Sequence, residues 1–237
     1  MIESIHNDKI KYLEKLSQKK YRDQEGLFLI EGRHLVEEAS KTGYLEEVLS
    51  LKEENIKTTI VSQKVLNYLS NQQSGTDIIG ICKKMDERAI KGNIVILDDI
   101  GDPGNLGTII RSALAFNIDT IVLSKHSVDL YNPKVIRSTE GMLFHINILR
   151  RDLNEFIKTI KNTHKILGTS VEGGSSITKY HNVSNFALII GSEGQGMHEE
   201  LKKLCDDLIY IPMNNKCESL NAGVSASILM YELDKEQ

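Results

Sequence analysis

The stretch IYIPMNNKCESLNAGVSASILMYE, residues 209–232, contains a strand end, a polar loop and a helix in direct succession. Pro212 cannot donate a hydrogen bond to a strand ladder, so it marks the limit of a strand. From Ser219 onward apolar residues recur at helical spacing, and Ser219 stands where an N-cap is expected. Five small residues near the start of this helix predict that another backbone approaches closely there, namely Ala222, Gly223, Ser225, Ala226 and Ser227.

The predicted helix is apolar on most sides, which indicates burial from several directions or a place at a subunit interface. Its first main-chain amides lack partners within the helix, and a polar loop leads into them. Such a helix start can hold a ligand. An ordinary capped core helix at the end of a domain has the same pattern, so this stretch alone leaves both interpretations open.

Residues 94–211, before this helix, alternate between apolar runs and helical patterns. Alternation of this kind predicts an α/β fold in which helices cover both faces of a parallel sheet. Continuous apolar runs such as 94–97 are typical of strands that are buried on both faces. The predicted strands are 94–97, 120–123, 145–149, 165–169, 186–190 and 208–211, and the helices are 106–116, a short one from Asn132, 153–161 and one near 199–205.

Two further unusual loops follow predicted strands. DDIGDPGNLG, residues 98–107, leads into a helix that carries Arg111. GSEGQG, residues 191–196, lacks the spacing of a dinucleotide fingerprint and the Lys-Ser/Thr of a P-loop. Its three glycines predict left-handed backbone or a very close approach. Ligands of open α/β sheets bind at the carboxyl ends of the strands, so the loops predict one shared site; a purely structural glycine turn is the alternative.

The acidic residues of the first loop admit two interpretations. Asp98, Asp99 and Asp102 are either magnesium ligands or turn and N-cap residues. No second carboxylate cluster follows a comparable strand, which favours the turn interpretation and predicts no metal. Arg111 is flanked by Ile110 and other apolar residues, so the pattern does not decide whether its side chain is solvated.

The first eighty residues form a separate alternation of short helices and strands. Helices are predicted at 8–18, 33–41 and 63–69, and strands at 27–30, 48–51, 58–61 and 78–82. The charged segment 83–93 ends in a glycine turn and is the predicted boundary. We therefore expect two domains, a small α/β domain at 1–88 and a larger one at 92–237.

Composition limits the class of protein. The chain of 237 residues is 40% hydrophobic, enough for a real core, and its net charge of −4 does not indicate a highly basic nucleic-acid binder. Charge is nevertheless segregated, because the first two dozen residues are locally basic; a solvated helix face is the alternative. Three cysteines without CxxC spacing predict neither disulfides nor zinc. No signal peptide or membrane span is recognisable, so we expect a cytoplasmic protein without a membrane partner.

The three loops, in this order, resemble the motifs of SPOUT-superfamily RNA methyltransferases, specifically the TrmH (SpoU) family of RNA ribose 2′-O-methyltransferases. The resemblance covers residues 94–233 and rests on DPGNLGTIIRSALAFN, IIGSEGQGM and IPMNNKCESLNAGVSASILMYEL. YNPK at 131–134 and residues 138–144 are similar to the family's middle segment. Residues 1–80 are similar to the family's substrate-binding domain, a ribosomal-protein type of RNA-binding fold.

This resemblance implies a SPOUT domain whose C-terminal part is threaded as a trefoil knot, an exception to the rule against threaded connections. It implies that S-adenosylmethionine binds in the knot as methyl donor, that no metal is needed and that the enzyme is a homodimer. The implied cofactor-binding residues are Thr169, Gly191, Gly194, Gly196, Ile211, Met213, Leu220 and Ala222.

The resemblance also implies a catalytic set, which consists of Asn105, Arg111, Glu193, Ser219 and Asn221. Arginine is effectively never deprotonated, so Arg111 is expected to bind a phosphate and the developing 2′-alkoxide while the phosphate or a water takes the proton. Ser219 and Asn221 are expected to orient the ribose. Asn105 is expected to bridge Arg111 to the cofactor loop, and Glu193 to fix one of these two residues.

The predicted function is methylation of a ribose 2′-hydroxyl in structured RNA, with 23S ribosomal RNA favoured over transfer RNA by analogy of the N-terminal domain. Two other hypotheses remain. A non-catalytic RNA-binding relative has no chemical need for all five catalytic residues. The other is a small-molecule enzyme with a different nucleotide cofactor. A binding screen distinguishes it from a methyltransferase, because such an enzyme should bind NAD or ATP and not S-adenosylmethionine.

Overall fold

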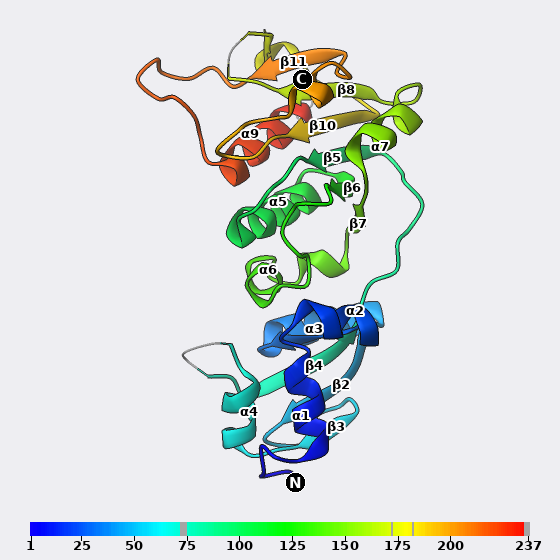
Figure 1. Ribbon diagram of the computed structural model, residues 1–237, viewed down its shortest axis with the longest axis vertical. Coiled ribbons are helices and arrows are strands. Elements are labelled where there is room, and N and C mark those ends of the chain that lie inside the picture. Colours follow the sequence, from blue (N-terminus) through cyan, green and yellow to red (C-terminus); the bar gives the residue numbers. More distant parts are fainter. Residues whose placement is uncertain (72–74, 172, 182, 235–237) are drawn as a thin grey trace. The chain divides into compact units, whose positions relative to one another are not determined.

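A sheet of seven parallel strands forms the centre of the C-terminal half in the computed structural model, which describes residues 1–71, 75–171, 173–181 and 183–234 (Figure 1). The strand order is β7-β6-β5-β10-β8-β11-β9, and every pairing is parallel, as the alternation predicts. The strands are β5 (Asn93–Leu97), β6 (Ile118–Leu123), β7 (Asn147–Arg150), β8 (Lys165–Thr169), β9 (Ser175–Ser176), β10 (Phe186–Ile190) and β11 (Asp207–Tyr210).

Helices cover both faces of this sheet. On one face α5 (Pro103–Ala115) packs on β6 and lies beside α9 (Ala222–Asp234), as Figure 1 shows. On the other face α7 (Leu153–Ile160) and α8 (Glu199–Lys202) enclose a core with side chains of β5, β8 and β10. A short 3₁₀ helix, η2 (Ile177–Lys179), follows β9. The two central strands β5 and β10 are almost fully buried, which confirms the prediction from their apolar runs.

The first loop of the site is shorter than predicted because α5 begins at Pro103 rather than at residue 106. Asp102 is its N-cap, and the Asp102 carboxylate accepts a hydrogen bond from the Asn105 amide at 2.9 Å. Pro103 occupies the first helical position, where its fixed φ favours the helix and no donor is lost. Asp102 therefore has the capping role of the turn interpretation.

The last helix begins at Ala222, so the prediction of Ser219 as its N-cap is wrong. Asn221 caps it instead, because the Asn221 Oδ1 accepts from the Val224 amide at 3.2 Å. The small residues act as predicted: a Cβ on Gly223 would lie 3.2 Å from Thr108 of α5, so the two helices approach closely there.

A second, four-stranded sheet occupies the N-terminal unit, in the order β1-β4-β2-β3. The pairs β1–β4 and β2–β4 are antiparallel and β2–β3 is parallel. The strands are β1 (Leu27–Glu31), β2 (Leu45–Ser50), β3 (Thr58–Ile60) and β4 (Ile78–Lys83), and the helices are α1 (Asp8–Lys15), α2 (Lys19–Glu25), α3 (Arg33–Thr42) and α4 (Gln63–Leu69). The pattern predicted each of these elements except α2, whose sequence KKYRDQE has almost no apolar periodicity.

The chain divides into two compact units, which differ from the predicted domains in one respect. Residues 1–86 and 129–145 form one unit, and residues 87–128 and 146–237 form the other. Thus the segment between β6 and β7, with α6 (Pro133–Ser138) and η1 (Met142–Phe144), packs with the N-terminal unit. Its aromatic residues explain this, since the ring centroids of Phe28 and Tyr131 lie 4.7 Å apart.

No helix within the described residues combines the length and the apolar character needed to cross a membrane.

Candidate active site

The strands β10, β8 and β11 are neighbours, and their carboxyl ends border a cavity of about 470 Å³ in the C-terminal unit. Thr169 ends β8, Gly191 follows β10 and Ile211 follows β11, so adjacent strands bring together residues that are far apart in sequence. Every predicted cofactor-binding residue lines this cavity, namely Thr169, Gly191, Gly194, Gly196, Ile211, Met213, Leu220 and Ala222.

The cavity wall combines apolar side chains with main-chain groups of loop residues. Ile209 and Leu229 are buried and supply apolar surface. Ile211, Met213 and Leu220 also line the cavity, and they lie in the loop between the end of β11 and the start of α9. Apolar walls with a few polar groups are what a ligand with a flat ring system and a polar tail requires. The donor and acceptor set therefore fits S-adenosylmethionine.

The loop 191–196 folds back on itself and shapes one side of the cavity. The Ser192 and Gly196 main chains exchange two hydrogen bonds, of 3.1 and 2.9 Å. A Cβ on Gly191 would collide with the main chain of Gly196, and Gly196 has a φ of 68°. The glycine prediction is thus confirmed at these two positions, whereas Gly194 faces open space with an ordinary φ.

Three of the predicted catalytic residues form one hydrogen-bonded cluster. Oε1 of Glu193 accepts from Nδ2 of Asn105 and from Nδ2 of Asn221, both at 2.6 Å. Nδ2 of Asn221 also lies 2.8 Å from Oδ1 of Asn105. A third donor to Glu193 is the amide of Ala222, at 3.3 Å. The carboxylate thereby ties the glycine loop to the start of α5 and to the start of α9.

Arg111 lies apart from this cluster. Its side chain is exposed, does not line the cavity, and has no hydrogen-bond or ion-pair partner among residues 1–71, 75–171, 173–181 and 183–234. Six residues separate Asn105 from Arg111, which at about 100° per residue places them on different sides of α5. The Asn105 side chain bonds to Glu193 and Asn221, and no hydrogen bond joins it to Arg111 among the described residues. Ser219 is exposed and lines the cavity.

Asp98 holds a histidine that sequence reasoning did not single out. The Asp98 carboxylate accepts from the His198 amide at 2.8 Å and lies 2.9 Å from Nδ1 of His198. This hydrogen bond raises the pKa of His198 above its ordinary value, and the Asp98 charge adds to the effect. Hence Asp98 connects the end of β5 to the segment that follows the glycine loop.

A cation could approach this corner, since ligand atoms of Asp98, Asp99 and His198 lie within 4.8 Å of one another. Their positions already have an explanation, because Asp99 accepts from Ser124 Oγ at 2.6 Å while Asp98 is engaged by His198. Asp98 and Asp99 are thus held by hydrogen bonds to other segments, and of the three aspartates only Asp102 has the predicted capping role.

Lys202 of α8 also lines the cavity and was missed from the sequence. Its Nζ pairs with Glu199 at 2.6 Å, an ordinary i, i+3 contact on a helix surface. No pattern distinguishes this lysine from its neighbour Lys203, because only the fold places Lys202 beside the loop.

Known proteins share this architecture. The sequence model of the SpoU rRNA Methylase family matches residues 92–231, and that of the MRM3-like substrate binding domain matches residues 7–80. The chain is 36% identical to the 23S rRNA (guanosine(2553)-2′-O)-methyltransferase RlmP of Bacillus subtilis, with 98% of each chain covered. It is 30% identical to a putative TrmH family tRNA/rRNA methyltransferase of Staphylococcus saprophyticus, over 86% of this chain and 87% of that protein.

Solved structures give the same result. The crystal structure of AdoMet-bound rRNA methyltransferase from Sinorhizobium meliloti superposes with a TM-score of 0.87 at 26% sequence identity. The match covers 98% of this chain and 96% of the Sinorhizobium chain. A crystal structure of an RNA 2′-O ribose methyltransferase has a TM-score of 0.84 at 28% identity, covering 98% and 97%. With a family match over more than half of its length, this chain belongs to the SpoU family and is an RNA ribose 2′-O-methyltransferase that takes its methyl group from S-adenosylmethionine.

Proposed function

We propose that this enzyme methylates the ribose 2′-hydroxyl of a guanosine in 23S ribosomal RNA. The observation that carries the proposal is the 36% identity to the Bacillus subtilis enzyme of that name over 98% of both chains. The similarity includes the N-terminal unit, where the match to a substrate-binding domain lies, as well as the C-terminal unit with its cavity. We place this reaction in the cytoplasm.

The cofactor site is the cavity at the ends of β8, β10 and β11. The main-chain groups of Ile211, Met213 and Leu220 would hold the polar atoms of S-adenosylmethionine, and Ile209 and Leu229 its flat ring. When bound, S-adenosylmethionine supplies a methyl group on a sulfonium sulfur, which needs no further activation. The remaining difficulty is the hydroxyl, a weak nucleophile until its proton leaves.

Arg111 is the residue that we assign to the hydroxyl. Its exposed guanidinium has no described partner, so its fork of donors is free for a phosphate of the RNA and the 2′-oxygen beside it. Arg111 would hold the 2′-oxygen while its proton passes to the phosphate or to a water. The methyl group would bond to this oxygen as its carbon–sulfur bond breaks, and the sulfur would leave as a neutral thioether. Charge stabilisation of this kind by one well-placed donor changes the rate by about 10²–10³.

Asn105, Glu193 and Asn221 act as positioning residues in this proposal. Their hydrogen bonds fix the glycine loop against the starts of two helices, and that loop lines the cofactor cavity. Ser219 also lines the cavity and is exposed, so its hydroxyl is available to orient the ribose.

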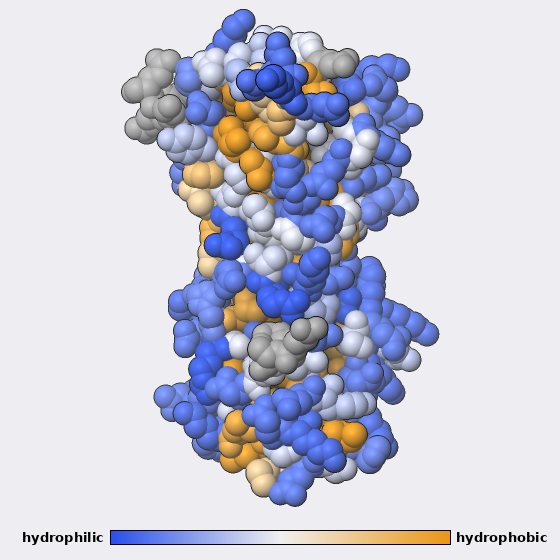
Figure 2. All heavy atoms as spheres, turned by 90° about the vertical axis from the view of Figure 1, so that its left-hand side faces the viewer, coloured by the Kyte–Doolittle hydropathy of each residue, from blue (hydrophilic) through white to orange (hydrophobic). Residues whose placement is uncertain are grey.

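A homodimer and a C-terminal trefoil knot complete the proposal. The outer side of α9 carries Val224 and Tyr231, which are 45% and 50% exposed. Figure 2 shows hydrophobic atoms reaching the surface of the C-terminal unit on the side where α9 lies. A helix with an apolar face on both sides suits contact with a second copy of the chain.

Methyl transfer to purified RNA tests the proposed function. The protein is incubated with methyl-labelled S-adenosylmethionine and either unmodified 23S ribosomal RNA or unmodified transfer RNA, with EDTA present. The proposal expects label in 23S ribosomal RNA, confined to one guanosine and absent when that ribose lacks its 2′-hydroxyl. Label in transfer RNA alone, or transfer that stops on chelation, contradicts it.

A further inference from the structure

A second cavity, of about 200 Å³, lies within the N-terminal unit and has no part in cofactor binding. The end of α1, the helix α2, strand β1 and the end of α4 border it. Tyr131 and Pro133 close it from the segment 129–145. The YNPK stretch, which the methyl-transfer site does not use, thus forms a wall of this cavity.

The wall at Tyr131 is rigid. The Tyr131 hydroxyl accepts a hydrogen bond from the Met85 amide at 3.0 Å, its ring contacts Phe28, and Lys84 lies 4.8 Å from its ring centroid. Contacts on three sides keep this ring in one orientation, so the cavity is formed before a ligand arrives.

The buried arginine of the cavity is not available to an anion. Arg22 is 4% exposed, and its terminal nitrogens donate to the carbonyls of Leu16 and Ser17 and to the carboxylate of Asp129 at 2.6 Å. Its positive charge is thereby balanced inside the protein. A phosphate would add a further negative charge beside the Asp129 carboxylate, which pairs with Arg22, and the Glu14 carboxylate, which lines the cavity. The cavity therefore suits a neutral ligand.

One polar group that lines the cavity lacks a partner. The Glu14 carboxylate is half-buried there and makes no hydrogen bond or ion pair with any residue that the structure describes. A carboxylate has two acceptor oxygens, so it complements a ligand that offers two neighbouring N–H donors. Guanine has such an edge, formed by its ring N–H and its exocyclic amino group.

We propose that this cavity binds a single unpaired guanine base of the RNA, and this inference rests on the proposed function in RNA methylation. The Glu14 carboxylate accepts from the two neighbouring N–H groups of the base. Tyr68, 45% exposed at the cavity, offers a ring on which the base stacks. Proteins recognise unpaired RNA bases by this combination of stacking and edge contacts.

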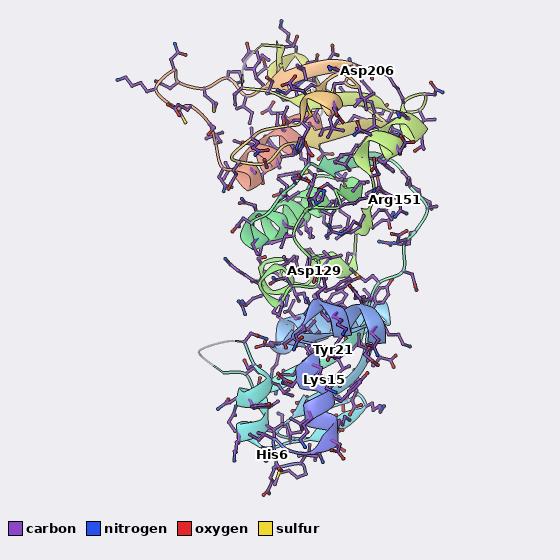
Figure 3. All side chains as sticks on the ribbon, in the orientation of Figure 1. His6, Lys15, Tyr21, Asp129, Arg151 and Asp206 are labelled. Atoms are coloured by element: carbon purple, nitrogen blue, oxygen red, sulfur yellow. The ribbon has the colours of Figure 1, made fainter. Side chains whose placement is uncertain are left out.

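Lysines beside the cavity supply the phosphate contacts that a base inside it needs. Lys15 ends α1, next in sequence to the cavity residue Leu16, and Lys19 and Lys20 begin α2. These lysines are exposed, and Figure 3 shows Lys15 near Tyr21, with Nζ 5.8 Å from the ring centroid. A neutral cavity flanked by exposed cations matches a base flanked by its phosphates.

Binding of short RNAs to the full-length protein tests the inference. Labelled single-stranded pentamers UUXUU, in which X is G, A, C or U, are titrated at fixed salt. The guanosine pentamer is expected to bind about ten-fold more tightly than the others, the discrimination of one bidentate base contact. Guanosine, and not inorganic phosphate, should compete with it.

Two variants and a control locate the effect. Glu14→Gln should abolish the guanosine preference, and Tyr68→Ala should weaken binding of all four pentamers about ten-fold through lost stacking. Glu37→Gln makes the same charge change on exposed α3 outside the cavity and should leave the preference unchanged. Equal binding of the four pentamers, an unchanged preference in Glu14→Gln, or competition by phosphate overturns the inference.

Methyl transfer measured on the same samples separates the two proposals. If 23S ribosomal RNA is methylated while the pentamers bind equally, the base cavity is wrong and the proposed function stands. If the pentamers behave as expected and 23S ribosomal RNA is not methylated, the proposed function is wrong and the base cavity stands.

Discussion

Nδ2 of Asn105 on α5 lies 2.6 Å from Oε1 of Glu193, so one hydrogen bond ties the first motif of the chain to its glycine loop. The same oxygen accepts from Asn221, at the start of α9. Residues that are 88 and 28 positions from Glu193 thus meet at one carboxylate. The account of the cofactor site depends on this junction, because the loop lines the cavity.

The junction predicts that Asn105 and Glu193 act as a unit. Asn105→Ala and Glu193→Ala should each weaken S-adenosylmethionine binding about ten-fold, and the double variant should be no weaker than the worse single one, since contacting residues are not additive. Calorimetry on the native protein, the two single variants and the double variant measures the coupling free energy between the two side chains. Asn117→Ala, at the far end of α5 where Asn117 meets Asp234, is the matched control. Additive losses would show that the two side chains act independently.

Arg111 should matter for transfer and not for cofactor binding, because it is exposed and lies outside the cavity. Arg111→Ala should lower methyl transfer by about 10²–10³ while S-adenosylmethionine affinity stays within a few fold. Arg111→Lys should also be poor, because an ammonium does not reproduce a planar fork. Arg88→Ala, also in the C-terminal unit, should be fully active. A fully active Lys variant would mean that charge alone suffices.

His198 should make thermal stability depend on pH. Its pKa is raised in the folded protein, chiefly by the hydrogen bond to Asp98, with Asp99 and Glu200 adding smaller effects. A raised folded pKa gives stability that is present below the unfolded value, about 6.5, and is lost as pH rises through the folded value. The Tm difference between the native chain and His198→Asn should therefore be larger at pH 5.5 than at pH 8.5. Equal Tm differences at the two pH values would show that the charge of His198 does not contribute to stability through this contact.

The exposed apolar side of α9 should form the interface of the proposed homodimer. Val224→Glu combined with Tyr231→Glu places charges on that side and should shift the protein from dimer to monomer, which sedimentation measures. Leu51→Glu changes a side chain that is 42% exposed in the N-terminal unit and should leave the dimer intact. If the native chain is already monomeric, or if the double variant stays dimeric, this side of α9 is not a dimer interface.

Much of the fold follows from the sequence because its strongest signals are local. Apolar runs such as those of β5 and β10 identify buried strands, and Asn132 before Pro133 identifies the start of α6. The extra helix α2 was missed because its sequence is polar all round. The N-cap of α9 was assigned two residues too early, since Ser219 and Asn221 are both good capping residues and only the fold selects between them.

The site was predicted by motif, and the connections between the motifs came from the structure. Residues at the strand ends meet because the strands are adjacent, which explains why every predicted cofactor residue lines one cavity. The partner of Glu193 depends on how α5 is rotated, whereas the helical period alone places Arg111 and Asn105 on different sides of α5. The sequence does not predict that residues 129–145 pack with the N-terminal unit. No change in composition and no linker marks the start or the end of this segment.

Mapping of ribose methylation in 23S ribosomal RNA tests the central claim most directly. RNA is compared from cells with the gene, cells without it, and cells that carry only the Arg111→Ala form. The account predicts that one guanosine carries a 2′-O-methyl group with the native gene and loses it in the other two strains. An unchanged methylation map, or a loss confined to transfer RNA, would contradict it.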